Sequence, residues 1–237
     1  MILHTVTKGS GEALVFLHSG LQTSTTDFIQ QQSMFSEQYQ VISPDLRGHG
    51  KSTAADISDF FKDSAQDLDE TFNKLDLQSA HIVGASLGAL VAIVFAKRFP
   101  SRVKTLTISG VTKQKPDNWQ SLHQQEAEMQ AQLLENEEAV SYMNDLHGPD
   151  WKRFIDMGKS ENWYPFNETD DLSRISSPVL VIAGEGSMNE SLSAIGYREE
   201  QENIHISIIP FASHLVHEEQ PELYSEVLGR FLENKMG

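Results

Sequence analysis

Residues 84–88 read Gly-Ala-Ser-Leu-Gly, and their types and spacing suit nucleophilic chemistry. A β-prone run, AHIVG at 80–84, leads into this Gly-x-Ser-x-Gly motif, and an apolar-faced helical pattern follows it directly. The glycines leave room for a tight turn from strand to helix, which would hold the serine in a strained backbone conformation. The motif therefore predicts that the hydroxyl of Ser86 stands at the amino end of a helix, ready to attack a carbonyl carbon.

Three further segments carry residues that could complete such a site. The segment LVFLHSG (14–20) ends a β-prone run in a turn that could supply a backbone N–H donor. The segment SPDLRGHGKS (43–52) forms a loop after the next run. The segment IPFASHLVH (209–217) places His214 just after the last run.

The elements that would position these residues alternate between β-prone runs and helical patterns. The β-prone runs are ALVFLH (13–18), YQVIS (39–43), AHIVG (80–84), VKTLTIS (103–109), PVLVIAG (178–184) and IHISIIP (204–210). Several are apolar at consecutive positions, which is typical of parallel strands covered by helices on both faces. The alternation predicts an α/β fold with a doubly wound, mostly parallel sheet, and the opening ILHTV predicts an added edge strand.

One segment, 112–171, interrupts the alternation. It contains no β-prone run and is rich in Gln and Glu, and we interpret it as two to four helices inserted before the last two strands. Ligands of open α/β sheets bind outside the carboxyl ends of the strands, so we expect this helical segment to form a lid there. The alternative is an ordinary helical excursion packed at the sheet edge. The expected division is a core of residues 1–111 and 172–237 and a lid of residues 112–171.

The motifs LHSG (17–20), DLRGHGKS (45–52), GASLG (84–88) and ASH (212–214) make the chain resemble the α/β-hydrolase superfamily, specifically its small lid-bearing serine hydrolases. The resemblance covers nearly the whole chain. It implies the α/β-hydrolase fold, with Ser86 as the nucleophile and His214 as the general base. The implied activity is cleavage of a small carboxylic ester, or of a related acyl bond, through an acyl-enzyme, with no metal and no organic cofactor.

The resemblance also implies an oxyanion hole made of two backbone N–H groups. The N–H of Leu87, which follows the nucleophile, matches one donor, and the N–H of Gly20 matches the other. The family usually has His-Gly where this chain has His18 and Ser19, so Leu21 remains an alternative to Gly20.

The carboxylate that would orient the histidine is missing from its usual position. The family most often places it in a Gly-Glu-x-Asp pattern after the run here read as PVLVIAG, and this chain has Ser187 at the Asp position. The other position used by relatives falls in ISGVTKQK (108–115), which contains no acid.

Three explanations of the missing acid stay open. We favour a nearby carboxylate, Glu185 first and Glu190 as its alternative, because Glu is one methylene longer than Asp and Gly186 loosens the loop. In the second explanation Ser187 or a backbone carbonyl orients His214. In the third there is no acid, and the chain is a catalytically weak or inactive small-ligand binding protein on a hydrolase scaffold.

Composition limits the partners. Lys and Arg number 18 against 34 Asp and Glu, and the resulting charge of −16 repels phosphate backbones and anionic lipid. We therefore expect a small-molecule substrate and neither nucleic acid nor membrane as a partner; monomer and dimer both stay open. The longest apolar run, residues 87–96, is too short to span a membrane, and the first residues lack a signal-peptide pattern, so we expect a cytoplasmic protein.

A metal site is not expected. The chain contains no cysteine, which excludes thiolate ligands, a thiol nucleophile and disulfides. His214 and His217 are three residues apart and could share a helix face, but the adjacent Glu218 and Glu219 fit better as acidic residues in the first turn of a helix.

Overall fold

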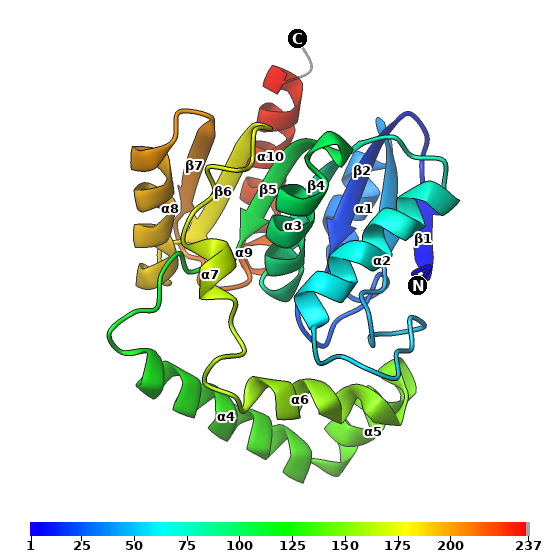
Figure 1. Ribbon diagram of the computed structural model, residues 1–237, viewed down its shortest axis with the longest axis vertical. Helices are drawn as coiled ribbons and strands as arrows, with labels where there is room; N and C mark the ends of the chain where they lie inside the picture. Colours follow the sequence, from blue (N-terminus) through cyan, green and yellow to red (C-terminus); the bar gives the residue numbers. More distant parts are fainter. Residues whose placement is uncertain (236–237) are drawn as a thin grey trace.

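The computed structural model describes residues 1–235, and its centre is one seven-stranded sheet in the order β1-β3-β2-β4-β5-β6-β7 (Figure 1). The strands are β1 (Thr5–Lys8), β2 (Glu12–Leu17), β3 (Tyr39–Pro44), β4 (Ala80–Ala85), β5 (Val103–Ser109), β6 (Val179–Gly184) and β7 (Ile204–Ile209). Strand β1 pairs antiparallel with β3, and the other neighbours are parallel. This confirms the predicted doubly wound, mostly parallel sheet.

The edge strand at the amino terminus lies later than its sequence pattern predicts. Strand β1 covers Thr5–Lys8, whereas ILHTV occupies residues 2–6. The reason is that the first residues pack along a helix instead. Leu3 is buried and its N–H donates to Thr71 Oγ1 at 2.9 Å, and the terminal amine of Met1 forms ion pairs with Asp67 and Glu70.

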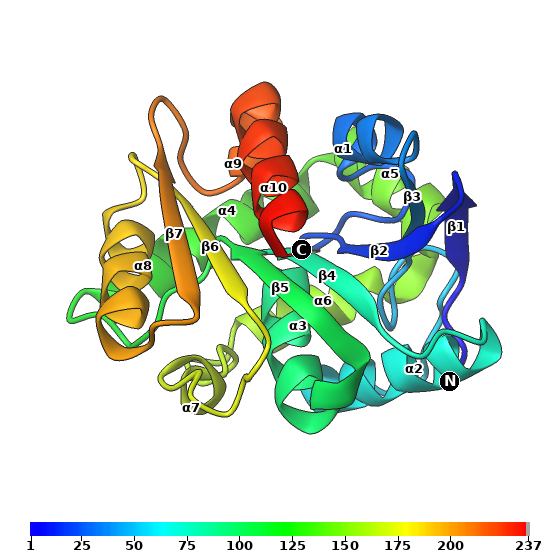
Figure 2. The ribbon, with the colours of Figure 1, turned by 90° about the horizontal axis from the view of Figure 1, so that it is seen from above.

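Helices cover both faces of the sheet. Figure 2 shows α1 (Ile29–Phe35), α9 (Val216–Glu219) and α10 (Pro221–Lys235) on one side, and α2 (Phe60–Lys74), α3 (Leu87–Arg98) and α8 (Met188–Glu200) on the other. The core accordingly divides into two apolar clusters, one on each face. Residues 87–96 of α3 are all buried, as expected of a helix that is apolar on every side and lies between the sheet and α2.

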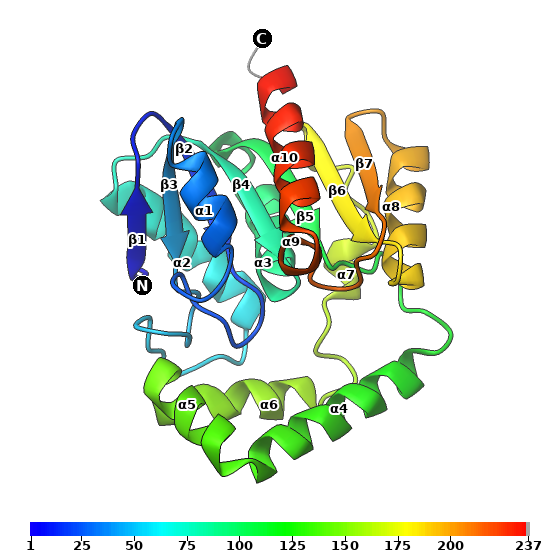
Figure 3. The same ribbon diagram turned by 180° about the vertical axis from the view of Figure 1, so that it is seen from behind.

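The segment between β5 and β6 is helical. It contains α4 (Trp119–Glu135), α5 (Glu137–His147), α6 (Lys152–Gly158) and α7 (Phe166–Thr169). Helices α4, α5 and α6 cross below one end of the sheet, the end at which the parallel strands finish (Figures 1 and 3). Asn136 caps α5 by accepting a hydrogen bond from the Ala139 N–H, and Gly148, at φ 74°, ends it. The division of the chain into core and lid at residues 112 and 171 stays a prediction.

Candidate active site

Ser86 stands on the tight turn that its motif predicts. Strand β4 ends at Ala85, helix α3 begins at Leu87, and Ser86 between them has φ 51° and ψ −117°, a conformation that is strained for a residue with a side chain. The Ser86 N–H donates to the Ser109 carbonyl on β5 at 2.8 Å, which holds the turn in place.

Both glycines of the motif are required by close backbone contacts. A Cβ atom on Gly84 would lie 2.6 Å from the Gly88 carbonyl oxygen, and one on Gly88 would lie 2.2 Å from the Leu17 carbonyl oxygen. Neither contact is sterically allowed, because real Cβ atoms do not approach oxygen so closely. The local sequence thus packs β4, α3 and the end of β2 together and lifts the Ser86 hydroxyl above the sheet.

His214 reaches Ser86 from the loop after β7. Its Nε2 lies 2.9 Å from Ser86 Oγ, and its Nδ1 lies 2.7 Å from Oε1 of Glu190. A carboxylate can only accept, so Nδ1 carries the proton and donates to Glu190, which leaves Nε2 to accept from the serine hydroxyl. Serine, histidine and carboxylate form one continuous chain of hydrogen bonds.

The carboxylate beside His214 is Glu190, so the prediction that Glu185 orients this histidine is wrong. Glu185 Oε2 instead accepts a hydrogen bond from the Phe211 N–H at 3.3 Å. The turn after β6 explains the difference, because the Ser187 N–H bonds back to the Gly184 carbonyl and α8 begins one residue later. The first turn of α8 then brings Glu190 back to the histidine. Ser187 Oγ lies 3.2 Å from Ser213 Oγ and makes no hydrogen bond to His214.

A sequence signal for Glu190 did exist. Ser187 and Glu190 have the Ser-x-x-Glu spacing of a capping box, in which the glutamate would turn back to the helix terminus. In the structure no side chain caps α8, and the Glu190 side chain, 11% exposed, points to His214 instead. Its other oxygen, Oε2, is buried without a hydrogen-bond partner, so the carboxylate is held by the histidine alone.

The charges around His214 favour its protonated form. Burial by itself would lower the pKa of His214, but the hydrogen bond to Glu190 and the charges of Glu190 and Glu126 outweigh it and raise the pKa above the ordinary histidine value. An imidazolium formed here is therefore stabilised by the carboxylate behind it.

Two backbone N–H groups beside Ser86 are available to a ligand. Gly20 and Leu87 line the same cavity as Ser86, and a Cβ on Gly20 would lie 3.9 Å from Leu87 Cβ. Within residues 1–235 neither N–H donates to a protein acceptor. The N–H of Leu21, the alternative donor, instead points at His49 Nε2 at 3.3 Å. The geometry therefore favours Gly20 over Leu21.

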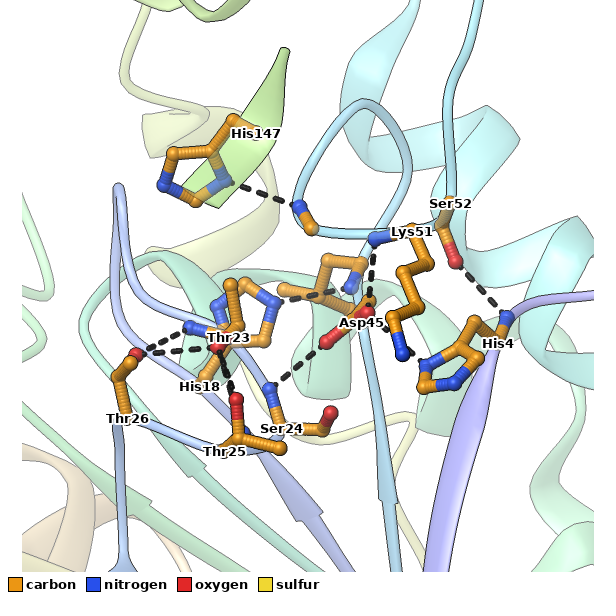
Figure 4. Close-up of polar contacts among 12 residues, drawn as sticks. His4, His18, Thr23, Ser24, Thr25, Thr26, Asp45, Lys51, Ser52 and His147 are labelled. Carbon is orange, nitrogen blue, oxygen red and sulfur yellow. Dashed lines mark hydrogen bonds and ion pairs between the residues drawn. The ribbon is translucent and has the colours of Figure 1, made fainter. Parts of the chain in front are cut away.

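The loop after β3 holds the turn that carries Gly20. Figure 4 shows Asp45 between His4, Ser24 and Lys51, with Asp45 oxygens accepting from the Ser24 N–H at 2.8 Å and the Lys51 N–H at 2.9 Å. Hydrogen bonds to these donors outweigh burial and lower the pKa of Asp45. In the same region His18 Nε2 accepts from the Leu46 N–H at 2.9 Å, and burial lowers the pKa of His18, which keeps the ring neutral.

Ser19, where the family usually has glycine, is fixed by a buried aspartate that the sequence did not reveal. The N–H and hydroxyl of Ser19 both donate to Asp27 Oδ2, at 2.7 and 2.9 Å. Asp27 Oδ1 accepts from His217 Nε2 at 2.6 Å, and both of these side chains are fully buried. Burial alone would raise the pKa of Asp27, but His217 and Ser19 lower it to about 2. Asp27 thus links the Gly20 turn to the short helix that follows His214.

Asp27, His217 and Glu218 are close enough to be considered as metal ligands. Their candidate ligand atoms lie within 4.8 Å of one another. However, both oxygens of Asp27 already accept protein hydrogen bonds, since Oδ1 also accepts from the Phe28 N–H at 2.9 Å, and Glu218 is exposed. The group fits a structural ion pair better than a metal site.

A cavity of about 250 Å³ opens above Ser86, at the small end of ligand-binding pockets. It is lined by Ser19, Gly20, Leu21, Gln22, His49, Ser86, Leu87, Glu126, Gln130, Phe154, Ile155, Met157, Gly158, Trp163, His214 and Leu215. The inserted helices α4 and α6 supply six of these residues, and apart from Trp163 the others come from the turns and loops after β2, β3, β4 and β7. The arrangement can place a small carbonyl compound against the Ser86 hydroxyl and the two free N–H groups.

Comparisons with known proteins agree with this geometry. The family model described as alpha/beta hydrolase fold matches residues 12–153, more than half of the chain. The chain is 27% identical to the carboxylesterase YbfK of Bacillus subtilis, covering 97% of this chain and 83% of that protein. It is 24% identical to the 2-(acetamidomethylene)succinate hydrolase of Mesorhizobium japonicum, covering 95% of this chain and 90% of that protein.

Solved structures share the fold. The crystal structure of NosK from Streptomyces actuosus superposes with a TM-score of 0.83 at 22% identity, covering 95% of this chain and 99% of that one. MenH from S. aureus gives 0.71 at 20% identity, covering 99% of both chains. None of the helices within residues 1–235 combines the length and the apolar character that a membrane crossing needs.

Proposed function

Because the chain belongs to the α/β-hydrolase fold family, we propose that it is a serine hydrolase that cleaves small carboxylic esters through an acyl-enzyme on Ser86. One observation carries the proposal, namely the hydrogen-bond chain from Ser86 Oγ through His214 to Glu190, with distances of 2.9 and 2.7 Å. The carboxylesterase among the similar proteins supports ester cleavage.

The reaction would begin when His214 Nε2 takes the proton of Ser86 as Oγ attacks the ester carbonyl carbon. The oxygen that becomes negative accepts hydrogen bonds from the N–H groups of Gly20 and Leu87, each worth roughly 3 kcal/mol in comparable sites. Glu190 accepts the hydrogen bond from His214 Nδ1 and stabilises the imidazolium. His214 then gives its proton to the departing alcohol, and water activated by the same nitrogen releases the acid from Ser86.

The inserted helices would act as a lid. Side chains from α4 and α6 line the cavity opposite Ser86, which supports a role in enclosing the substrate and limiting its size. The partner of this site is a small molecule, and the mechanism uses no metal and no organic cofactor.

Covalent labelling with a fluorophosphonate tests the proposal, because such probes react with activated serines. The parent protein should be labelled, and Ser86→Ala and His214→Ala should not. Glu190→Gln should slow labelling by up to roughly 10⁴-fold, since loss of a triad acid costs about this much in turnover. Glu185→Gln is the matched control and should label like the parent. Equal labelling rates in Glu190→Gln and the parent would contradict the role of Glu190.

The alternative of an inactive ligand-binding protein depended on the missing carboxylate. Glu190 removes that reason, because a carboxylate does hydrogen-bond to His214 Nδ1. A parent protein that fluorophosphonates leave unlabelled, under conditions that label a control hydrolase, would restore the binding-protein hypothesis.

A further inference from the structure

Helix α4 presents a carboxylate to the cavity that the proposed mechanism does not use. Glu126 lines the cavity together with Ser86 and His214. Its one protein hydrogen bond within residues 1–235 is a long contact of 3.4 Å from Gln130 Nε2. Burial raises the pKa of Glu126, while the charge of His214 acts in the opposite direction, so the two groups interact across the cavity.

Gln130 lies beside Glu126 on the same wall and satisfies it poorly. Its Nε2 approaches Glu126 Oε1 only at 3.4 Å, and its own Oε1 is buried, away from a ligand in the cavity. The Glu126 carboxylate therefore keeps acceptor positions open to a ligand N–H.

Positive charge is scarce on this wall. Among the residues that line the cavity in the described structure there is neither Lys nor Arg, and His49 is held neutral because burial lowers its pKa well below the ordinary value. His214 also lines the cavity and its pKa is raised, but its Nδ1 is bonded to Glu190 and its Nε2 must be unprotonated to take the proton of Ser86. In the active form a carboxylate on the substrate would therefore meet Glu126 without a cation to pair with, which costs free energy on transfer from water.

We propose that this cavity selects esters that carry a protonated amine, whose N–H donates to Glu126, and rejects esters that carry a carboxylate. The inference rests on the proposed function, because it names the substrate class of the same site. An ammonium group supplies both the N–H donor and the positive charge that Glu126 lacks.

Isosteric esters test the inference, because they vary charge at nearly constant shape. On the alcohol side the set is dimethylaminoethyl acetate, isoamyl acetate and β-acetoxypropionate. On the acyl side it is methyl β-(dimethylamino)propionate, methyl isocaproate and monomethyl succinate. Near pH 7 the amines are protonated and the acids ionised. The readout is the ratio of kcat/KM for the cationic ester to kcat/KM for its neutral isostere. If a substitution at Glu126 or Glu128 also changes the reactivity of His214, both esters are affected alike and the ratio does not change.

In at least one set the parent should prefer the amine to its isostere by roughly tenfold or more, and the carboxylate should be the poorest substrate. Glu126→Gln should bring the amine preference close to one and raise the relative rate of the carboxylate. Glu128→Gln removes the same charge from the exposed side of α4 and should keep the parent's preference. Labelling of each variant by the fluorophosphonate shows that its site is folded.

The outcomes separate the two proposals. A labelled parent that prefers the neutral or anionic ester in both sets, or that hydrolyses neither amine, overturns the amine inference and leaves the serine hydrolase standing. An amine preference that survives Glu126→Gln overturns it as well. A parent that is neither labelled nor active on any of the six esters overturns the proposed function, and the amine inference with it.

Discussion

At the scale of single residues, the contact with Glu190 sets the behaviour of His214. The hydrogen bond at 2.7 Å raises the pKa of His214 above its ordinary value of about 6.5. Only the neutral imidazole can take the serine proton, so kcat/KM should rise with pH through this raised pKa. The acid limb of the pH profile therefore reports the contact directly.

Replacing Glu190 should move that limb. In Glu190→Gln the Glu190 charge that raises the pKa of His214 is gone, so the acid limb of kcat/KM should shift to lower pH while kcat falls by about 10⁴-fold. Hydrolysis of a nitrophenyl ester measured across the pH range checks both effects. Glu185→Gln, which leaves the contact intact, should reproduce the parent profile; a limb that shifts in Glu185→Gln and not in Glu190→Gln would contradict the assignment.

Asp27 should contribute to stability in a pH-dependent way. Its pKa is lowered to about 2 in the folded protein, so the stabilisation is complete above the unfolded value near 4 and is lost as pH falls from there to about 2. The shift corresponds to about 2 kcal/mol. Asp27→Asn, which breaks a buried pair with His217, should lower the free energy of unfolding near neutral pH by about 3 kcal/mol.

Denaturant unfolding at several pH values measures this contribution. The exposed Asp145→Asn is the matched control and should change the free energy of unfolding by less than about 0.5 kcal/mol. The account of Asp27 is contradicted if Asp27→Asn is as stable as this control, or if the difference between parent and Asp27→Asn persists unchanged at low pH.

At the scale of elements, the inserted helices are tied to the turn that carries Gly20. His147, at the end of α5, accepts from the Gly50 N–H through Nδ1 at 2.9 Å and donates from Nε2 to the Leu21 carbonyl at 3.0 Å. Phe154 on α6 packs on the ring of His49, whose Nε2 accepts from the Leu21 N–H. The insert contacts the turn that carries Gly20 and would therefore position one side of the proposed oxyanion hole.

Breaking this tie should slow turnover without removing the nucleophile. His147→Ala should lower kcat by roughly tenfold with a smaller change in KM, because a displaced donor weakens binding of the transition state more than binding of the substrate. His147→Gln keeps a donor and an acceptor and should recover part of the rate. Steady-state kinetics of the two variants test whether His147 positions the turn that carries Gly20. An unchanged kcat in His147→Ala would contradict this role.

Local signals were enough to predict some elements. The motif around Ser86 fixes its own turn through two glycines, and His214 follows a recognisable last strand, so both lie where their neighbours in sequence require. Which carboxylate contacts His214 depends instead on the turn after β6 and on the orientation of α8. These bring Glu190 to His214, whereas Glu185 accepts a hydrogen bond from the Phe211 N–H. The Asp27–His217 pair joins residues that are 190 positions apart, which no local pattern reveals.

At the scale of the whole molecule, the charge of −16 adds to the local effect of Glu126. A negative field draws cations toward the cavity and is screened by salt over a Debye length of about 8–10 Å at physiological ionic strength. For dimethylaminoethyl acetate, kcat/KM should fall as salt concentration rises, whereas for isoamyl acetate it should stay nearly constant. Initial rates in a salt series measure the difference, and parallel curves for the two esters would exclude electrostatic attraction.

If Ser86 is the nucleophile, it is acylated during turnover, and the acyl-enzyme can be trapped. The parent is mixed with a nitrophenyl ester, quenched in acid, digested and examined by mass spectrometry, with Ser86→Ala treated in parallel. We expect the mass of one acyl group on the peptide that contains Ser86 and none in the variant. Ester hydrolysis by the parent with no acylated Ser86, or an equal rate of hydrolysis by Ser86→Ala, would contradict this role of Ser86.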